Sequence, residues 1–259
     1  MSTMPSSSPV LRTLAIAAFA VFASGCATQP PSVATDACPV RPVTEHDPAE
    51  SLNRGVFAFN RTLDRYLLAP VARGYRHLPL FVQHGVHNFV ANFGEPKVFI
   101  NDLLQGNAQR SARTVGRFAL NTTVGIVGLV DVSGRMGIER HQADFGQTFG
   151  VWNIADGPVV ELPLLGTGNL RDASGRVLGL AISPFGDNSD TLDALATFNT
   201  VGGVIDGRAE ALPLTRELEQ APDYYAALRD TVAEQRADFV REGKAGVPVD
   251  CSDAAALDD

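Results

Sequence analysis

Two histidines and three aspartates are the side chains whose spacing could support chemistry in this sequence. His84 and His87 lie three residues apart, so on a helix they could share a face and offer two nitrogen ligands to a metal. No third ligand follows at an obvious spacing, and we favour the alternative of two histidines on a polar helix face. Asp144, Asp156 and Asp172 could act as paired acid and base, but turns and helix caps use Asp equally well.

The sequence contains none of the short motifs that mark common catalytic sites. It lacks a G-x-S-x-G nucleophile elbow, an H-E-x-x-H zinc motif, a P-loop and a C-x-x-C pair. We therefore expect no enzyme, no cofactor and no metal, with a lipid hydrolase kept as a minority hypothesis. The net charge of −8 argues against nucleic acid as a partner, because phosphate binding needs clustered Lys and Arg.

The N-terminus predicts export. Residues 1–25 have a positively charged start, an apolar run over 14–22 and then small residues, which is the three-part pattern of a signal peptide. Met4 is an alternative start. No run of 18 uncharged apolar residues follows in the rest of the chain, so the sequence predicts no membrane-spanning helix.

A lipid attachment site ends this signal. Ala23-Ser24-Gly25-Cys26 resembles a bacterial lipobox, in which the Cys thiol and then the new amino terminus are acylated. We predict lipidation of Cys26; the alternative is an ordinary signal peptide with a chance Cys. Ala27 follows where an Asp would signal retention in the inner membrane, which points to the outer membrane. Several acyl chains would hold the protein there, because each buried CH₂ contributes ~0.8 kcal/mol.

The remaining two cysteines lie in the predicted tails. Cys38 is in a proline-rich tether over residues 26–46, and Cys251 is in an acidic tail over residues 244–259. An oxidising compartment allows a disulfide between them. Two free thiols in the tails are the other reading.

Between the tails, residues 47–243 predict a mostly α-helical domain. Apolar residues recur at helical spacing, with Asp47 expected to cap the first helix and Asn107 a later one. We expect a break at Gly94-Glu95-Pro96, separate helices over 191–204 and 207–218, and a last helix ending at Gly243. Residues 159–162 are the best strand prediction.

One stretch, residues 144–172, stands apart within this helical pattern. It contains the chain's only Trp, many glycines, and Pro158 and Pro163, which forbid a long helix. The stretch therefore predicts a Gly/Pro-rich, non-helical, hairpin-like insert. Composition alone favours a loop packed on a core; the alternative is a flexible functional segment.

Ordered short motifs carry a family resemblance over residues 47–243. The sequence resembles the MlaA (VacJ) family of outer-membrane lipoproteins in these motifs: Asp47-Pro48-x-Glu50, Leu52-Asn53-Arg54, Phe57-x-Phe59-Asn60, Asn88-Phe89, Asn92-Phe93, Glu95-Pro96, residues 101–106, Arg117-Phe118-x-Leu120-Asn121-Thr122, Gly125-x-x-Gly128-Leu129-x-Asp131-Val132, residues 145–148, Gly150, Gly157-Pro158, Leu162-Pro163, Gly166 and residues 170–172.

The resemblance implies a ring-like, lipid-anchored, single helical domain on the periplasmic side of the outer membrane of a Gram-negative bacterium. Such a protein has an amphipathic channel and associates with a trimeric porin. It takes mislocalised phospholipid from the outer leaflet and hands it to a periplasmic phospholipid-binding shuttle protein, which maintains lipid asymmetry. The alternative function is a structural lipoprotein that organises porins or the envelope without moving lipid.

The resemblance also suggests roles within residues 144–172. In this reading the stretch lines or gates the channel, and Arg171 meets the phosphate of a headgroup, with surface salt bridging as the alternative. The residues expected to line or gate the channel are Gly146, Gly150, Trp152, Asn153, Gly157 and Pro158.

Overall fold

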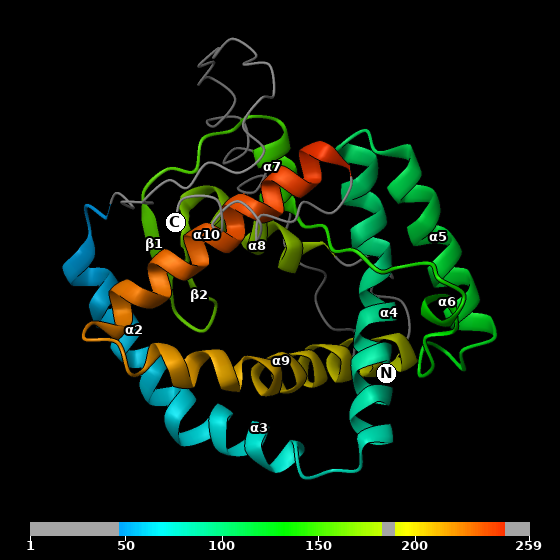
Figure 1. Cartoon of the computed structure of the whole chain (residues 1–259), viewed down its shortest axis with the longest axis horizontal. Helices are drawn as coiled ribbons and strands as arrows, with labels where there is room; N and C mark the ends of the chain where they lie inside the picture. Colours follow the sequence, from blue (N-terminus) through cyan, green and yellow to red (C-terminus); the bar gives the residue numbers. More distant parts are fainter. Residues whose placement is uncertain (1–46, 183–189, 247–259) are drawn as a thin grey trace, which may run out of the picture. The chain divides into compact units, whose positions relative to one another are not determined.

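The computed structural model describes residues 47–182 and 190–246, and these are mostly α-helical (Figure 1). This confirms the predicted class. The signal peptide, Cys26, the tether, Cys38, residues 183–189, Cys251 and the tail beyond 246 lie outside the described residues. The helices are α2 (Glu50–Leu63), the π-helical turn η1 (Asp64–Leu68), α3 (Ala69–Tyr75), α4 (Leu80–Leu104), α5 (Ala108–Thr123), α6 (Val132–Arg135), α7 (Phe145–Val151), α8 (Leu170–Ala181), α9 (Asp190–Leu218) and α10 (Tyr224–Ala245).

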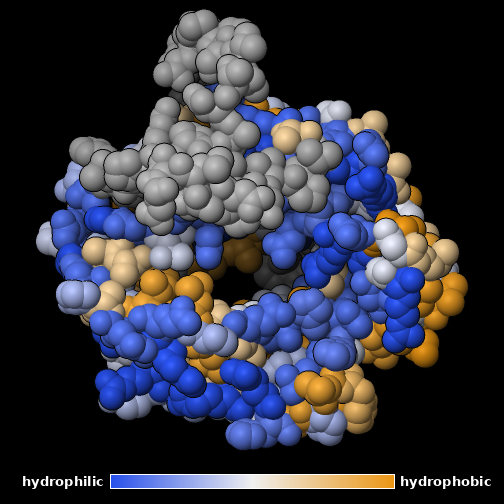
Figure 2. All heavy atoms as spheres, viewed as in Figure 1, coloured by the Kyte–Doolittle hydropathy of each residue, from blue (hydrophilic) through white to orange (hydrophobic). Residues whose placement is uncertain are grey.

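Contacts between these elements close into a ring. The continuous helical run of α2, η1 and α3 packs on α9, and α9 packs on α4. Helix α4 also packs on α5 and α7, α7 packs on α8 and α10, and α10 contacts the small sheet that rests on α2. The space-filling view shows a hollow inside this circuit, bordered by α4, α8 and α9 (Figures 1 and 2). We call it the central hollow.

Helix α4 runs through the predicted break. Pro96 lies inside the helix, although proline removes a backbone hydrogen bond and disfavours a helix interior. The neighbouring Glu95 is buried and pairs with Arg117 of α5. The break prediction was wrong because packing of α4 against α5 overrides the local preference.

Helix α9 is likewise one helix rather than two. Residues between the two predicted segments hold it to its neighbours: Asp206 accepts a hydrogen bond from Tyr75 of α3, and Arg208 pairs with Asp64 of η1 at 2.5 Å. A Cβ added to Gly207 would have no atom within 4 Å, so this glycine marks no close contact. These two side-chain anchors favour a continuous helix over the turn that a sequence with adjacent Gly and Asp suggests.

Helix termini follow the cap predictions in part. Asn107 accepts a hydrogen bond from the backbone N–H of Arg110 and caps α5, as expected. Asp47 does not cap α2; its carboxylate accepts hydrogen bonds from Asn53 and from the Tyr225 hydroxyl instead. The last helix continues two residues past Gly243 and ends before Gly246, whose φ of 70° suits a glycine.

The hairpin-like insert is confirmed at residues 159–169. Strands β1 (Val159–Leu162) and β2 (Gly166–Asn169) pair antiparallel, with Val159 opposite Asn169 and Leu162 opposite Gly166. Two amides two helical turns apart on α2 complete the outer edge of β1. Asn53 bonds the Val159 carbonyl and the Glu161 N–H, and Asn60 bonds the Leu162 carbonyl and the Leu164 N–H. The hairpin is therefore clamped to α2 through side-chain amides.

Candidate functional site

Among the described residues, many polar side chains are buried and many large apolar side chains are exposed, beside a small apolar core that includes Phe89 and Phe145. The largest fully buried side chains are all polar: Arg117, Gln147, Glu95, Asn101, Thr114, Thr148, Asp102, Asp172 and Ser133. Large apolar side chains are exposed on most elements, among them Phe81, which is 77% exposed, and Tyr66, which is 76% exposed. A water-soluble protein has the opposite tendency, because burial of charge is costly and burial of apolar surface is favourable.

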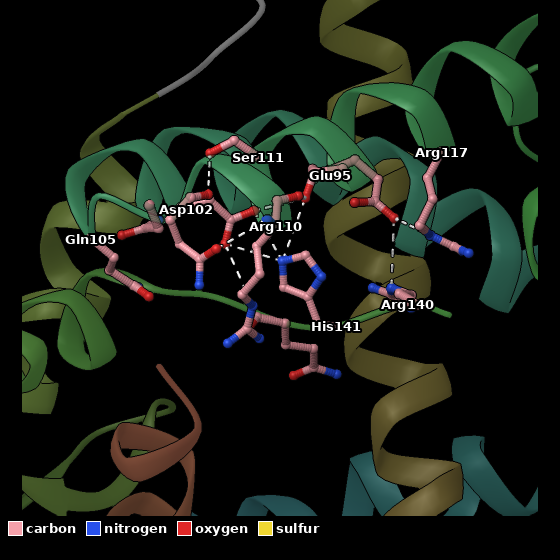
Figure 3. Close-up of polar contacts among 12 residues, drawn as sticks. Glu95, Asp102, Gln105, Arg110, Ser111, Arg117, Arg140 and His141 are labelled. Atoms are coloured by element: carbon pink, nitrogen blue, oxygen red, sulfur yellow. Dashed lines mark hydrogen bonds and ion pairs between the residues drawn. The ribbon is translucent and has the colours of Figure 1, made fainter. Parts of the chain in front are cut away.

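One buried network joins α4 to α5 and to the segment after α6 (Figure 3). Arg117 is its centre: the guanidinium lies 3.3 Å from a Glu95 oxygen and 3.1 Å from an Asp131 oxygen, and donates to the Ile138 carbonyl. Burial raises the pKa of Glu95, and Arg140 and Arg117 oppose that rise. Burial and the charge of Arg117 lower the pKa of Arg140, which lies 3.9 Å from Glu95.

A second cluster surrounds Asp102, one helical turn from the end of α4 (Figure 3). His141 lies 2.9 Å from its carboxylate, and the Thr114 hydroxyl donates to the same carboxylate at 2.7 Å. In a hydrolase the imidazole would bridge the acid and the hydroxyl. Here the hydroxyl bonds the acid directly and is buried, so the cluster is arranged to hold α4, α5 and the 136–144 segment together.

A third polar junction links α7, α8 and α10. Arg236 of α10 contacts Asp144 at 2.7 Å and Asp172 at 3.0 Å. Burial alone would raise the pKa of Asp144, but the hydrogen bonds and charge of Arg236 outweigh it and hold that pKa below its ordinary value. Asp144 and Asp172 thus share one guanidinium, and Asp144 also caps α7 through the Gln147 N–H. Asp144 therefore serves as a helix cap, and both aspartates serve as ion-pair partners. These structural roles are the alternative to acid–base catalysis.

Part of the 144–172 stretch is helical. Helix α7 follows Asp144 directly, and two of the predicted channel residues are close-packing glycines within it. A Cβ on Gly146 would meet Asp172 and Arg236 at 2.7 Å, and a Cβ on Gly150 would meet Val240 of α10 at 2.6 Å. A lining or gating role for these two glycines stays a prediction; their observed contacts are with neighbouring helices.

The other predicted residues lie after α7. Trp152 is half exposed and donates its indole N–H to the Leu104 carbonyl, and Asn153, at a φ of 61°, accepts from Lys244. Gly157 also has a positive φ, of 73°, and the Pro158 carbonyl accepts from the Leu170 N–H. These residues form the turn that leads into β1, and their channel role is likewise still a prediction.

Arg171, the predicted headgroup contact, has carboxylate partners within the chain. Its side chain is buried and pairs with Asp156 and with Asp172, the latter at 3.0 Å. The pair with Asp156 ties the start of α8 to the turn after α7, whereas the pair with Asp172 lies within α8. Contact with a headgroup stays a prediction, and it would require the phosphate to compete with these two carboxylates.

The contact between α7 and α8 allows a sharp stability prediction. A Cβ on Gly175 of α8 would lie 2.3 Å from the Gly146 nitrogen and 2.7 Å from its Cα. Gly175→Ala should therefore force the two backbones apart and lower the free energy of unfolding by about 2 kcal/mol or more. Denaturant titration of the detergent-solubilised protein, followed by circular dichroism, measures the change.

Gly116→Ala on α5 is the matched control, since nothing lies within 4 Å of its Cβ position. It should raise the free energy of unfolding by about 0.5–1 kcal/mol, because alanine loses less backbone entropy in a helix. Equal effects at the two positions would contradict the close contact.

The two histidines that the sequence singled out, His84 and His87, have different surroundings in the structure. His87 contacts two carboxylates of α9, Asp206 at 2.8 Å and Glu210 at 3.1 Å. His84, one turn earlier on α4, lines a cavity that His87, Asp206 and Glu210 also line. Sequence reasoning missed the carboxylates because they lie more than a hundred positions away and because the predicted division of α9 left Asp206 between two helices.

The segment between α5 and α6 is apolar, exposed and conformationally strained. Val124, Ile126, Val127 and Leu129 are each 45% exposed or more. Ile126 and Val127 have φ values of 55° and 56°, a region that β-branched residues rarely adopt. We call residues 124–130 the apolar loop; hydrophobic residues appear along the edge beside α5 and α6 (Figure 2). Among the described residues, no helix is sufficiently long and apolar to traverse a bilayer.

Comparison with known proteins identifies consistent relatives. A family model described as MlaA lipoprotein matches residues 45–238. The intermembrane phospholipid transport system lipoprotein MlaA of Escherichia coli is 32% identical over 225 residues, covering 82% of this chain and 85% of that protein. An uncharacterised protein of Rickettsia felis is 35% identical over 197 residues, covering 74% of this chain and 76% of its own length.

A solved structure is also similar. It comes from work on the structural basis for maintenance of bacterial outer membrane lipid asymmetry. The TM-score is 0.65 at 33% identity, over 76% of this chain and 100% of the solved chain. The family model, the sequence relatives and the solved structure thus agree.

Proposed function

The chain belongs to the MlaA lipoprotein family, and on that premise we propose that it retrieves phospholipid from the outer leaflet of the outer membrane. The lipid headgroup passes through the central hollow, and a soluble periplasmic lipid-binding protein receives the molecule. This removal maintains the lipid asymmetry of the membrane. The protein acts as a transport component and performs no covalent chemistry in this proposal.

The observation that carries the proposal is the reversed distribution of polarity. Exposed apolar side chains such as Phe81 and Ile126 suit contact with acyl chains, while hydrophilic residues that border part of the central hollow suit a hydrated path (Figure 2). A charged headgroup crossing hydrocarbon alone costs several kcal/mol, so a polar interior inside an apolar exterior lowers that barrier. The ring of contacts around the central hollow supports such a path.

Lipidation at Cys26 supports the location. Acyl chains at this residue would hold the ring at the periplasmic face of the outer membrane, and the 20 residues 27–46 would act as the tether. A trimeric porin is the proposed neighbour in the membrane, on the strength of the family resemblance. The exposed apolar residues of the ring offer a surface for lipid and porin alike.

Deletion of the gene followed by complementation tests the proposal. Cells without the protein should accumulate phospholipid in the outer leaflet and become sensitive to detergent with a chelator, and the wild-type gene should reverse both. A structural lipoprotein that only organises porins would alter porin distribution while leaving surface phospholipid normal. Unchanged surface phospholipid in the deletion strain would therefore remove the transport function.

Arg140 is the guanidinium that we expect to meet a headgroup phosphate. Its side chain is 29% exposed, and its pKa is lowered by burial and then by the neighbouring charge of Arg117. Glu95 already opposes this lowering of the pKa, and a phosphate beside the guanidinium would stabilise its charged form further. Arg140→Gln should slow retrieval about tenfold, since a hydrogen bond to a charged group contributes about 1.5–3 kcal/mol.

The matched control is Arg135→Gln, which removes an exposed guanidinium at the end of α6. It should retrieve phospholipid at the wild-type rate. Both variants are scored by surface phospholipid in the complemented strain, at equal protein level. Wild-type retrieval by Arg140→Gln would show that this cation is not used.

A further inference from the structure

His87 lies between two carboxylates that belong to a different helix. Its Nδ1 is 2.8 Å from an Asp206 oxygen and 3.1 Å from a Glu210 oxygen. One ligand atom from each of the three residues falls within 4.8 Å of the others. The cluster joins α4 to α9 at the corner of the ring where α3 ends, away from the networks around Arg117 and Asp102.

The fold positions the three side chains independently of any ligand. Asp206 and Glu210 are four residues apart on α9, so they share a helix face. Asp206 is 8% exposed, and its second oxygen accepts a hydrogen bond from the Tyr75 hydroxyl at 2.9 Å. That bond fixes the carboxylate and leaves the oxygen facing His87 for another partner, as the outer-shell groups of metal sites do.

The cluster faces a cavity. Its volume is about 440 Å³, and Tyr75, His84, His87, Asp206 and Glu210 line it. His87 is 42% exposed along its side chain and Glu210 is 64% exposed. A small ion therefore has access from solvent, and space remains for water molecules in its coordination shell.

The cluster brings two carboxylates to one imidazole, and Arg76 lines the same cavity without a salt bridge to either carboxylate among the described residues. Asp206 and Glu210 are like charges at i,i+4 on a helix, so they repel each other. Among the described residues, His87 forms salt-bridge contacts with both of them. Arg140 interacts with Glu210 through space, and no salt bridge joins them. A divalent cation would neutralise both carboxylates at once.

We propose that His87, Asp206 and Glu210 form a binding site for a transition-metal cation of the Zn²⁺ class. The mixture of one imidazole nitrogen with carboxylate oxygens suits Zn²⁺, whereas Ca²⁺ requires six or more oxygens and Mg²⁺ retains most of its water. The three protein ligands leave at least one position open to the cavity. The bound ion would tie α4 to α9, and through Tyr75 to α3.

The spacing of the ligand atoms fits this class of ion. Zn–N and Zn–O bonds of about 2.1 Å place neighbouring ligands of a tetrahedral site about 3.4 Å apart. The two observed distances from His87 are 0.3–0.6 Å shorter than that spacing. Tyr75 fixes Asp206, so the more exposed His87 and Glu210 are the side chains that must shift to widen both distances.

Titration calorimetry tests the site on the full-length lipoprotein in detergent, with its free thiols alkylated and all chelator removed. We expect ZnCl₂ to bind in a one-to-one ratio with a micromolar or lower Kd. His87→Ala should weaken binding at least 100-fold, and Tyr75→Phe should weaken it about tenfold through loss of the outer-shell bond. His77→Ala, which removes an exposed histidine outside the cluster, should bind like the wild type.

Cobalt provides a second measurement that does not depend on affinity. Co²⁺ in a four- or five-coordinate site should give visible absorption bands that disappear in His87→Ala and persist in His77→Ala. Binding of Zn²⁺ that is unchanged in His87→Ala, or the absence of stoichiometric binding to a folded wild-type protein, would overturn the proposal. Either result would leave the proposed lipid retrieval untouched, because that function is read from surface phospholipid.

Discussion

Arg117→Ala is expected to lower the free energy of unfolding by about 3–5 kcal/mol, the largest stability loss that we predict for this protein. The side chain is 2% exposed and contacts Glu95 of α4, Asp131 and the Ile138 carbonyl. Removing it leaves Glu95 buried beside Arg140 alone, at 3.9 Å. The loss is therefore the cost of burying Glu95 without the hydrogen bond from Arg117 and with only the more distant Arg140 as partner, and denaturant titration in detergent measures it.

A double substitution separates the charge from the packing. Arg117→Met with Glu95→Gln removes both charges and keeps similar volume, so its loss should be smaller than the sum of the two single losses. Arg113→Ala, on an exposed face of the same helix, should change the free energy by less than about 0.5 kcal/mol. Additive single effects would mean that the Arg117–Glu95 pair contributes nothing of its own.

The sequence predicted the helical class, the cap at Asn107 and the hairpin because each depends on neighbours in the chain. It failed at Pro96, where packing against α5 keeps the helix intact, and it divided α9 at a glycine that marks no close contact. Asp47 illustrates the same limit, since Tyr225, 178 positions away, binds the carboxylate that local sequence assigns to a cap. Long-range contacts decided each of these points.

The candidate site was less predictable than the fold. The sequence singled out residues 144–172 by glycine and proline, and the structure shows that Gly146 and Gly175 are used where two backbones meet. It gave no sign of the polar interior, because Glu95, Asp102 and Arg117 resemble the solvent-facing residues of amphipathic helices. A single sequence does not reveal which face of a helix meets solvent when the solvent is partly lipid.

This reversal connects stability to the proposed function. Ion pairs and amides hold α4, α5, α7, α8 and α10 together beside a small apolar core, so many of the large apolar side chains are left exposed. Those side chains remain available for acyl chains. A water-soluble ring with the same helices would carry its apolar side chains inside and its polar side chains outside. It would then lack both the polar interior and the apolar outer surface that the proposed function needs.

Ile126→Asn is expected to weaken membrane contact while leaving the fold at least as stable. Ile126 has a φ of 55° and is 64% exposed. The backbone of the apolar loop is fixed by hydrogen bonds from Val127 to Thr122, from Gly128 to Asn121 and from Val130 to Gly125. Asparagine adopts this left-handed conformation more readily than a β-branched residue, so the strain falls as the apolar contact is lost.

The two effects are measured separately. Thermal unfolding in detergent should show no loss of stability. Binding to phospholipid vesicles, by the chain from residue 26 onward with Cys26→Ser to remove the acyl anchor, should weaken at least about tenfold, because a buried Ile side chain contributes about 1.5–3 kcal/mol. Ile126→Leu keeps the apolar contact and should bind nearly as tightly as isoleucine. If the Ile126→Asn variant bound vesicles as tightly as the Ile126→Leu variant, the apolar loop would not lie in the membrane. Its strained residues would then need another explanation.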